Sequence, residues 1–183
     1  MTTAPTLSRI HHVAYRCRDA AETVEFYQRV LGMAYTTAFS EDKVPSTGED
    51  DPYMHVFLDA GQGNVLAFFE LPNSPEMGRD TNTPEWVQHI AFEVDSLETL
   101  EAAKARLQAA GIDVVGVTDH TIFKSIYFFD PNGHRLELAY NTATTTMNQA
   151  LDAVKWDMLN EWSRTKQAPK HAAWMHDASL ARP

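Results

Sequence analysis

The stretch "HHVAYRCRD" at residues 11–19 recurs in altered form as "QHIAFEVD" at residues 88–95. Each stretch begins with a histidine before an alternating apolar run, and each ends at an aspartate followed by a helix-like pattern. An alternation with a period of two is typical of a half-buried strand. A strand followed by a helix therefore opens both halves of the chain, which indicates an internal duplication.

The first half continues as one helix and three strands. Asp19 is a suitable N-cap for an apolar pattern with helical spacing, and Gly32 is a suitable stop, which predicts a helix over 19–31. The acidic segment 40–52 is rich in helix and strand breakers, and we expect it to be a mobile loop. Strands are expected at 33–39, 53–59 and 64–71.

The second half repeats this layout after a proline-rich connector at 72–85. A strand is expected at 86–94, followed by a helix at 96–110 with Ser96 as its N-cap. The turn sequence "DPNG" separates the last two of the expected strands, which are 112–118, 124–130 and 134–140. Each half therefore has the order β-α-β-β-β.

The predicted fold is α+β, with two βαβββ modules (9–71 and 86–140) that form one incomplete-barrel domain over 1–143. Segment 144–183 is expected to be a C-terminal helix and tail. Apolar residues at helical spacing over 144–165 indicate packing on the domain or on a second subunit, so a homodimer is expected.

Composition excludes several classes of protein. The formal net charge of −10 argues against nucleic acid or an anionic membrane surface as a partner. No apolar run approaches the roughly 18 residues of a membrane span, and the N-terminal residues lack a secretory signal pattern, so we expect a cytoplasmic protein. The only cysteine, Cys17, cannot form an intrachain disulfide, and a buried packing role is expected for it.

Strand parity selects four candidate metal ligands. Side chains of a strand alternate between its two faces, so His12 shares a face with Ala14, away from its apolar neighbours. By the same rule His89 shares a face with Ala91. Two glutamates project opposite to apolar neighbours near the last strand of each half, Glu70 and Glu137.

Pseudo-symmetry between the modules would bring these four side chains into one cleft. Carboxylates among apolar strand residues are costly unless they are paired or bind a metal. Two imidazoles with one or two carboxylates suit Fe(II), Mn(II), Ni(II), Co(II) or Zn(II). The set does not suit a structural zinc site, which prefers cysteines.

The chain resembles the vicinal oxygen chelate superfamily, which includes glyoxalase I, methylmalonyl-CoA epimerase, antibiotic resistance proteins and extradiol dioxygenases. The resemblance covers roughly 9–140 and rests on "HHVAYRCRDAAETVEFYQRVLGM", "HIAFEVD" and "DPNGHRLEL". It implies a small-molecule substrate and metal ligands at His12, His89 and Glu137, and in glyoxalase- or epimerase-like members also at Glu70.

The segment "TDHTIFKSIYFFDPNGHRLE" at 118–137 resembles the ring-cleavage signature of extradiol dioxygenases. The resemblance implies that His120 and Tyr127 hydrogen-bond the substrate and stabilise developing charge. It also implies an Fe(II) centre, an aromatic diol substrate and a place in aromatic catabolism.

Three functions therefore stay open. The first is the Fe(II) dioxygenase, although the connector 72–85 lacks the base histidine usual in that family, and His55 is the nearest alternative. The second is a glyoxalase- or epimerase-like lyase or isomerase, which a fourth ligand at Glu70 would favour. The third is a small-molecule-binding protein without catalysis, which predicts loss of the histidine and glutamate positions, yet all four are present.

Overall fold

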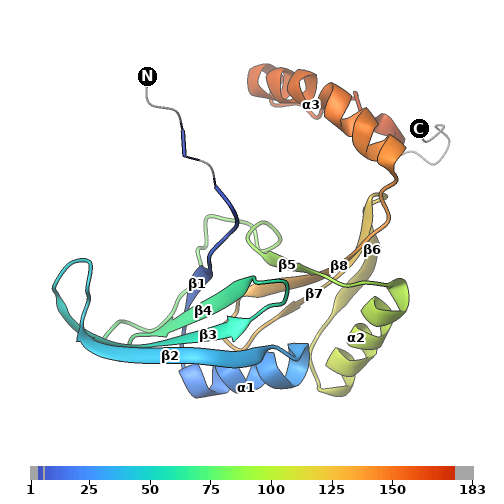
Figure 1. Cartoon of the computed structure of the whole chain (residues 1–183). Coiled ribbons are helices and arrows are strands. Elements are labelled where there is room, and N and C mark those ends of the chain that lie inside the picture. Colours follow the sequence, from blue (N-terminus) through green and yellow to red (C-terminus); the bar gives the residue numbers. More distant parts are fainter. Residues whose placement is uncertain (1–3, 6, 176–183) are drawn as a thin grey trace. The chain divides into compact units, whose positions relative to one another are not determined.

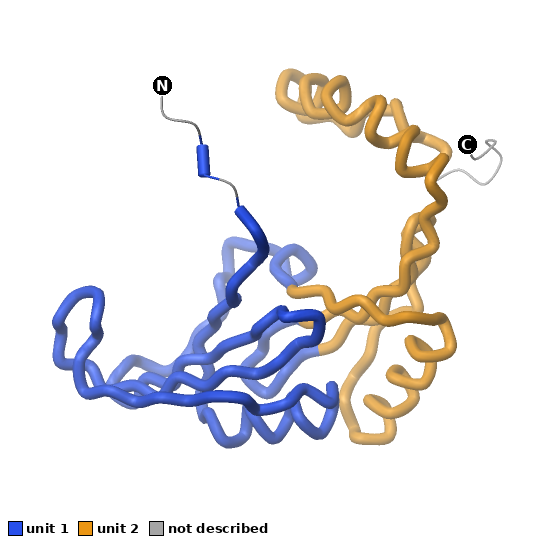
Figure 2. Tube along the Cα trace, viewed as in Figure 1, with its two compact units in different colours: residues 1–89, 129–135 blue, residues 90–128, 136–183 orange. Residues whose placement is uncertain are grey.

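The computed structural model describes residues 4–5 and 7–175 of the chain. The chain divides into two compact units, unit 1 with residues 1–89 and 129–135 and unit 2 with residues 90–128 and 136–183 (Figure 2). Each unit contains one four-stranded mixed sheet and a helix between its first and second strands. The predicted α+β class and the repeated β-α-β-β-β order are therefore confirmed.

Unit 1 contains the sheet with the strand order β1-β4-β3-β2 (Figure 1). Strand β1 runs parallel to β4, and the other neighbouring strands are antiparallel. The elements are β1 (Val13–Cys17), α1 (Ala20–Leu31), β2 (Ala34–Lys43), β3 (Asp50–Asp59) and β4 (Val65–Glu70).

Helix α1 begins and ends where its sequence predicts. The Asp19 carboxylate accepts a hydrogen bond from the Glu22 backbone amide, and Gly32 ends the helix at φ 71°, a conformation that glycine adopts without steric cost. The buried side of the helix packs on one face of the sheet, where the ring centroids of Tyr27 and Phe68 lie 5.0 Å apart. This packing defines a helix-covered face of the first sheet.

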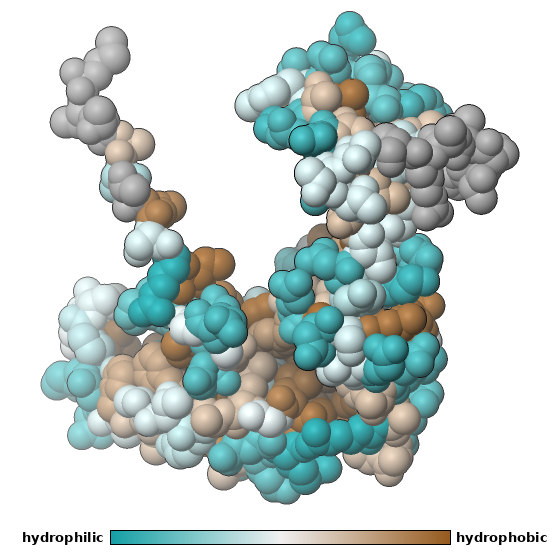
Figure 3. Space-filling view, turned by 45° about the vertical axis from the view of Figure 1, so that its right-hand side comes forward, coloured by the Kyte–Doolittle hydropathy of each residue, from teal (hydrophilic) through white to brown (hydrophobic). Residues whose placement is uncertain are grey.

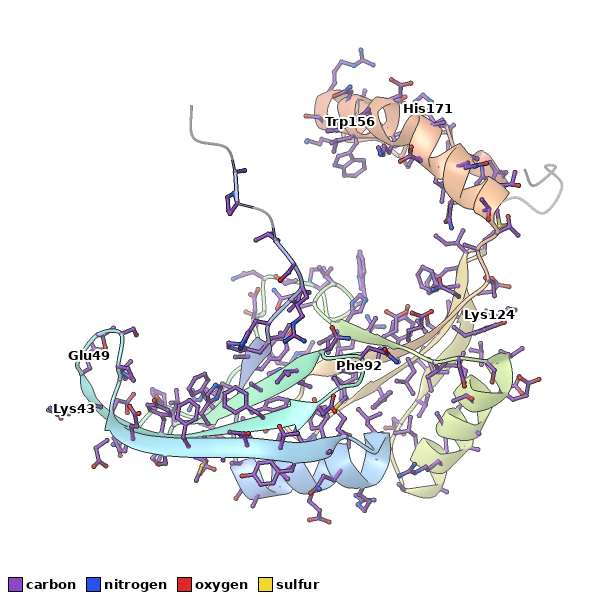
Figure 4. All side chains as sticks on the ribbon, in the orientation of Figure 1. Lys43, Glu49, Phe92, Lys124, Trp156 and His171 are labelled. Atoms are coloured by element: carbon purple, nitrogen blue, oxygen red, sulfur yellow. The ribbon has the colours of Figure 1, made fainter. Side chains whose placement is uncertain are left out.

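The β2–β3 hairpin is longer than the sequence predicted. Strand pairing continues to Lys43 and Asp50, whose side chains form a 2.6 Å ion pair. Residues 40–43 and 50–52 therefore belong to β2 and β3, so the expectation of a loop over all of 40–52 is wrong, and the connection is confined to 44–49. Figure 4 labels Lys43 and Glu49 at this end of the hairpin. Strand β2 is exposed along its whole length, and its polar sequence therefore lacks the apolar alternation that marks a half-buried strand.

Unit 2 contains the sheet with the strand order β5-β8-β7-β6. Its buried apolar side chains include Leu100 and Leu107 of the helix and Ile126, Phe128 and Leu136 of the sheet. The elements are β5 (Ile90–Glu93), α2 (Leu97–Ala109), β6 (Val115–Asp119), β7 (Phe123–Phe129), β8 (Arg135–Asn141), α3 (Thr145–Thr165) and the 3₁₀ turn η1 (Ala173–Met175).

The turn between β7 and β8 groups with unit 1 rather than with its own strands. The buried Asp130 carboxylate accepts a hydrogen bond from the Tyr27 hydroxyl at 3.1 Å. Asn132 accepts from the Arg18 amide and donates to the Thr23 hydroxyl. These hydrogen bonds explain why residues 129–135 group with unit 1.

The C-terminal segment begins with a hydrogen-bonded cap, in which Thr144 accepts from the amide of Met147. The chain reverses after α3 at Lys166, which has φ 54°, and His171 then contacts Glu161 of the helix at 2.9 Å. The Thr121 hydroxyl donates to the carbonyl of Met175, so this segment groups with unit 2. Of the helices in the described residues, none combines the length and apolar character needed to cross a membrane.

Candidate functional site

His12 lies immediately before β1, and the register of that strand assigns its face. Ala14 pairs with Ala67 and Arg16 with Phe69, and cross-strand partners share a face of the sheet. The His12 ring lies 6.0 Å from the Phe57 ring, between centroids, which places it over the face opposite to α1. The parity prediction for His12 is therefore confirmed.

Glu70 projects to the other face of the same sheet. It pairs with Cys17 on β1, and Cys17 lies on the face that α1 covers. The Glu70 carboxylate accepts a 2.7 Å hydrogen bond from the Ala20 amide at the N-terminus of α1. The expectation that Glu70 shares a face with His12 is wrong, because parity compares a residue with its neighbours and does not say which face the helix covers.

The two sheets show which residue of the first is equivalent to Glu137 of the second. His12 precedes Ala14 by two residues, and Ala14 pairs with Ala67. His89 precedes Ala91 by two residues, and Ala91 pairs with Glu137. Ala67 therefore occupies the position equivalent to Glu137, and Glu70 does not.

His89 lies immediately before β5. Its Nδ1 atom is 3.0 Å from the carbonyl oxygen of Val87, an arrangement in which Nδ1–H donates to the carbonyl. A neutral imidazole that donates through Nδ1 carries its lone pair on Nε2. Backbone carbonyls orient metal-binding histidines in this way.

Glu137 is only 3% exposed, although it carries a carboxylate. It lies between Leu136 and Leu138, both of which are buried, and its carboxylate accepts a hydrogen bond from the Ser125 hydroxyl on β7. A buried carboxylate requires compensation by hydrogen bonds, opposite charge or a metal. The serine hydroxyl supplies part of that compensation and fixes the orientation of the carboxylate.

Tyr127 follows Ser125 by two residues on β7, so both side chains project from the face that carries Glu137. The Tyr127 hydroxyl is 2.9 Å from His120 Nε2, within hydrogen-bonding distance. The His120 ring also stacks on Phe123, with 4.6 Å between centroids. The two residues that the ring-cleavage resemblance selected therefore form a contact pair in unit 2.

His55 belongs to the same face of the first sheet as His12, and the sequence offered it only as the nearest alternative to the missing base histidine. It is buried, its Nδ1 contacts the Phe68 carbonyl at 3.0 Å, and its ring stacks on Phe69 at 3.5 Å. Burial lowers the pKa of His55 below its ordinary value, the Phe68 hydrogen bond opposes this shift, and His12 adds a smaller lowering. The alternation of Tyr53, His55 and Phe57 in "YMHVFLD" was the available signal.

The family model of the glyoxalase/bleomycin resistance protein/dioxygenase superfamily matches residues 9–138 of the chain. The chain belongs to this superfamily. The match includes both sheets, the His12 and His89 positions and the paired strands that carry Tyr127 and Glu137. It ends before α3.

Two curated relatives within the superfamily have different printed activities. The chain is 29% identical over 133 residues to "Putative ring-cleaving dioxygenase MhqA" of Bacillus subtilis, a match that covers 70% of this chain and 39% of that protein. It therefore spans about two fifths of the length of that relative. It is 25% identical over 135 residues to "Glyoxylase I 4" of Arabidopsis thaliana, covering 72% of this chain and 70% of the relative.

A solved structure of the superfamily supports the fold. The glyoxalase I of Leishmania major superposes with a TM-score of 0.57 at 20% sequence identity, covering 86% of this chain and 99% of that one. At this identity the likeness concerns the fold alone. The substrate of this chain must therefore be argued from its own residues.

Superfamily members bind divalent metals, and the donor types in this chain fit such an ion. His12 and His89 belong to unit 1 and Glu137 belongs to unit 2. Neither unit by itself gathers three or more His, Cys, Asp or Glu side chains into a metal-binding group among its described residues. The buried Glu137, oriented by Ser125 on an otherwise apolar strand, is the observation that fits a metal ligand.

Proposed function

We propose that the chain is a metal-dependent, extradiol-type dioxygenase that cleaves a small aromatic diol. In this reaction one ring carbon–carbon bond next to the diol breaks, and both atoms of O₂ enter the ring-opened product. The proposal is supported by a superfamily that includes dioxygenases and by the relative whose printed name describes ring cleavage. Within the chain itself, the His120–Tyr127 pair and the buried carboxylate of Glu137 also support it.

We propose His12, His89 and Glu137 as the protein ligands of one divalent metal ion. Two histidines and one carboxylate are the ligand set of non-haem Fe(II) oxygenases, so Fe(II) is favoured, although Mn, Ni, Co and Zn also accept these donors. When bound, Fe(II) would supply the redox chemistry and the open coordination positions that this reaction requires. Ala67, at the position equivalent to Glu137, supports three protein ligands rather than four.

His120 and Tyr127 would handle protons on the substrate. The 2.9 Å contact lets one proton be shared between His120 Nε2 and the Tyr127 oxygen. With His120 donating through Nε2, the Tyr127 hydroxyl hydrogen can point to a substrate oxygen and stabilise the negative charge that develops there. Stacking on Phe123 restricts the His120 ring, so the ring loses little conformational freedom when a substrate binds.

The observation that carries the proposal is the His120–Tyr127 pair on the sheet face that also holds Glu137. A metal ligand and a proton-transferring pair on one face are what an oxygenase of this type needs. A hydrogen-bonded pair with no chemical role would serve equally well in the interior of the sheet, whereas both His120 and Tyr127 are only half-buried.

The test is oxygen consumption by protein loaded anaerobically with Fe(II). We expect O₂ uptake with catechols, matched by a yellow ring-opened product and abolished in Glu137→Gln. Replacement of His171, a tail histidine that contacts Glu161, provides a matched control and should leave the rate unchanged. No uptake across a panel of diols would refute the proposal.

A glyoxalase- or epimerase-like lyase or isomerase is the second candidate, favoured by the relative named "Glyoxylase I 4". Such chemistry needs a base beside a metal-bound carbonyl compound. It is weakened here because Glu70 is engaged by the α1 amide of Ala20 and faces the helix. Turnover of a carbonyl substrate with Ni(II) or Co(II), without O₂ uptake, would establish this second function.

We also propose that the chain forms a homodimer through α3. Three large apolar side chains on that helix are exposed: Trp156 at 66%, Leu159 at 55% and Trp162 at 47%. Figure 4 shows Trp156 projecting from the helix, and the face of α3 that is visible in Figure 3 is mostly hydrophilic. Other exposed positions of the helix, such as Asp152, Lys155 and Asp157, are charged. A small apolar patch with a polar surround is typical of a protein–protein contact.

A further inference from the structure

Arg16 is a cation on the sheet face that carries His12. Among the described residues, its guanidinium group has few hydrogen-bond partners. Arg16 of β1 lies four residues after His12, which immediately precedes the strand, so both side chains project from the same face. Its Nη2 donates to the Pro75 carbonyl at 2.6 Å. The structure gives its Nε no hydrogen-bond partner, although this atom is buried.

Among the described residues, no carboxylate forms an ion pair with Arg16. A buried donor without a partner is destabilising, and native proteins rarely tolerate one without a reason. The planar fork of a guanidinium matches a carboxylate better than any other common anion of small metabolites except phosphate.

The surroundings of Arg16 on this face are aromatic. Phe69 is its register partner on β4, and His55 and Tyr53 contact the Phe69 ring, with centroids 3.5 Å and 5.4 Å away. Phe57, which contacts both His55 and His12, continues the aromatic surface toward the proposed metal ligand. Aromatic faces bind planar rings by offset or edge-to-face stacking.

The spacing along β1 gives the size of the molecule that fits. Four residues at a strand rise of about 3.3 Å separate the Cα atoms of His12 and Arg16 by roughly 13 Å. Because the side chains of both residues extend into this distance, a molecule that contacts both of them is shorter than the Cα separation. A ring that meets the His12 end with its hydroxyl groups reaches the Arg16 end through a carboxylate on a short side chain.

We propose that Arg16 binds the carboxylate of an aromatic acid, and that the substrate class is dihydroxyphenyl alkanoates rather than uncharged catechols. The diol part of this statement rests on the proposed dioxygenase function. The recognition of an aryl carboxylate by Arg16 rests only on the residues of the first sheet. The two parts can therefore fail separately.

The first experiment uses metal-free protein, treated with EDTA, and two ligands of the same shape. Calorimetric titration compares 3-phenylpropanoate with the uncharged 3-phenylpropan-1-ol. We expect the acid to bind about tenfold more tightly or better, because hydrogen bonds between two charged groups are stronger than those between neutral groups. Equal affinities, or no measurable binding of the acid, would overturn the assignment of Arg16.

Variants then test whether Arg16 causes the preference for the acid over the alcohol. Arg16→Gln should reduce acid binding to the level of the alcohol, whereas Arg18→Gln, which changes an exposed arginine two residues away, should not. Arg16→Lys keeps the charge and should retain part of the preference, with stronger weakening by salt. An unchanged preference in Arg16→Gln would refute the proposal, and Arg16→Lys decides the matter if the glutamine variant does not fold.

Turnover with Fe(II)-loaded protein tests the substrate class. We expect kcat/KM for 3,4-dihydroxyphenylpropanoate to exceed that for 4-propylcatechol about tenfold, mainly through KM, and Arg16→Gln to remove the difference. Equal values for both diols in the wild type would overturn the class. Acid binding without O₂ uptake from any diol would instead refute the dioxygenase and leave the Arg16 assignment standing.

Discussion

Ala67 occupies in the first sheet the register position that Glu137 occupies in the second. The two β-α-β-β-β modules are thus alike in layout, but the first has an alanine where the second has the carboxylate of Glu137. An alanine cannot bind a metal, and the nearest glutamate, Glu70, binds the helix terminus instead. The proposed ligand set is therefore limited to His12, His89 and Glu137.

Removal of a proposed ligand should remove the metal and leave the fold. We expect His89→Ala and Glu137→Ala each to bind Fe(II) at least about 100-fold more weakly, since even residues that only orient a ligand contribute 10- to 100-fold. The measurement is metal content after dialysis, with circular dichroism to verify folding. Wild-type metal content in either variant would contradict the set.

Glu70→Gln should lower the stability of the fold and leave metal binding unchanged, the reverse of the effect expected for the ligand variants. The Glu70 carboxylate accepts from the Ala20 amide near the positive end of α1, and loss of this charge-assisted hydrogen bond should lower the free energy of unfolding by about 1 kcal/mol. Metal content should be unchanged. Chemical denaturation and metal analysis on the same sample test both parts, and loss of metal would return Glu70 to the ligand set.

Strand parity predicted much of this arrangement from the sequence. The face of His12 and the caps at Asp19 and Ser96 all follow from short-range patterns. These features depend on residues close in sequence, where alternation and capping rules operate.

Features that depend on pairing between distant strands were not predictable in the same way. The face of Glu70 and its equivalence to Glu137 require the registers of β1 with β4 and β5 with β8, and a shift by a few residues changes the equivalence. The length of the β2–β3 hairpin was missed because an exposed strand carries no apolar alternation. The role of Asn132 in joining the β7–β8 turn to Arg18 had no local signal either.

Tyr127→Phe isolates the proposed proton donor. The variant keeps the ring and loses the hydroxyl that contacts His120 Nε2 at 2.9 Å. We expect kcat to fall about 100-fold, as when one donor to a developing negative charge is removed, with metal content unchanged. Steady-state O₂ uptake beside metal analysis provides the measurement, and a wild-type kcat would assign Tyr127 a packing role.

His55 should make stability depend on pH. Burial lowers its pKa below the ordinary value of 6.5, so below that value the unfolded chain binds a proton more readily than the folded one. The free energy of unfolding should therefore be fully retained above pH 6.5 and decrease as the pH falls through the folded-state pKa. Urea denaturation between pH 7.5 and 5 should show a smaller decrease in His55→Gln, and identical decreases would contradict the prediction.

Trp156→Glu tests the proposed dimer. Trp156, Leu159 and Trp162 lie within two turns of α3, and a charge placed among them would be buried without a partner in an interface formed by two copies. We expect the wild type to elute as a dimer in size-exclusion chromatography with light scattering, and Trp156→Glu to elute as a folded monomer. Ala153→Glu places the same charge on an exposed position about 120° around the helix from the centre of this patch, and it should remain dimeric. A monomeric wild type, or a dimer that persists in Trp156→Glu, would show that α3 does not form the contact.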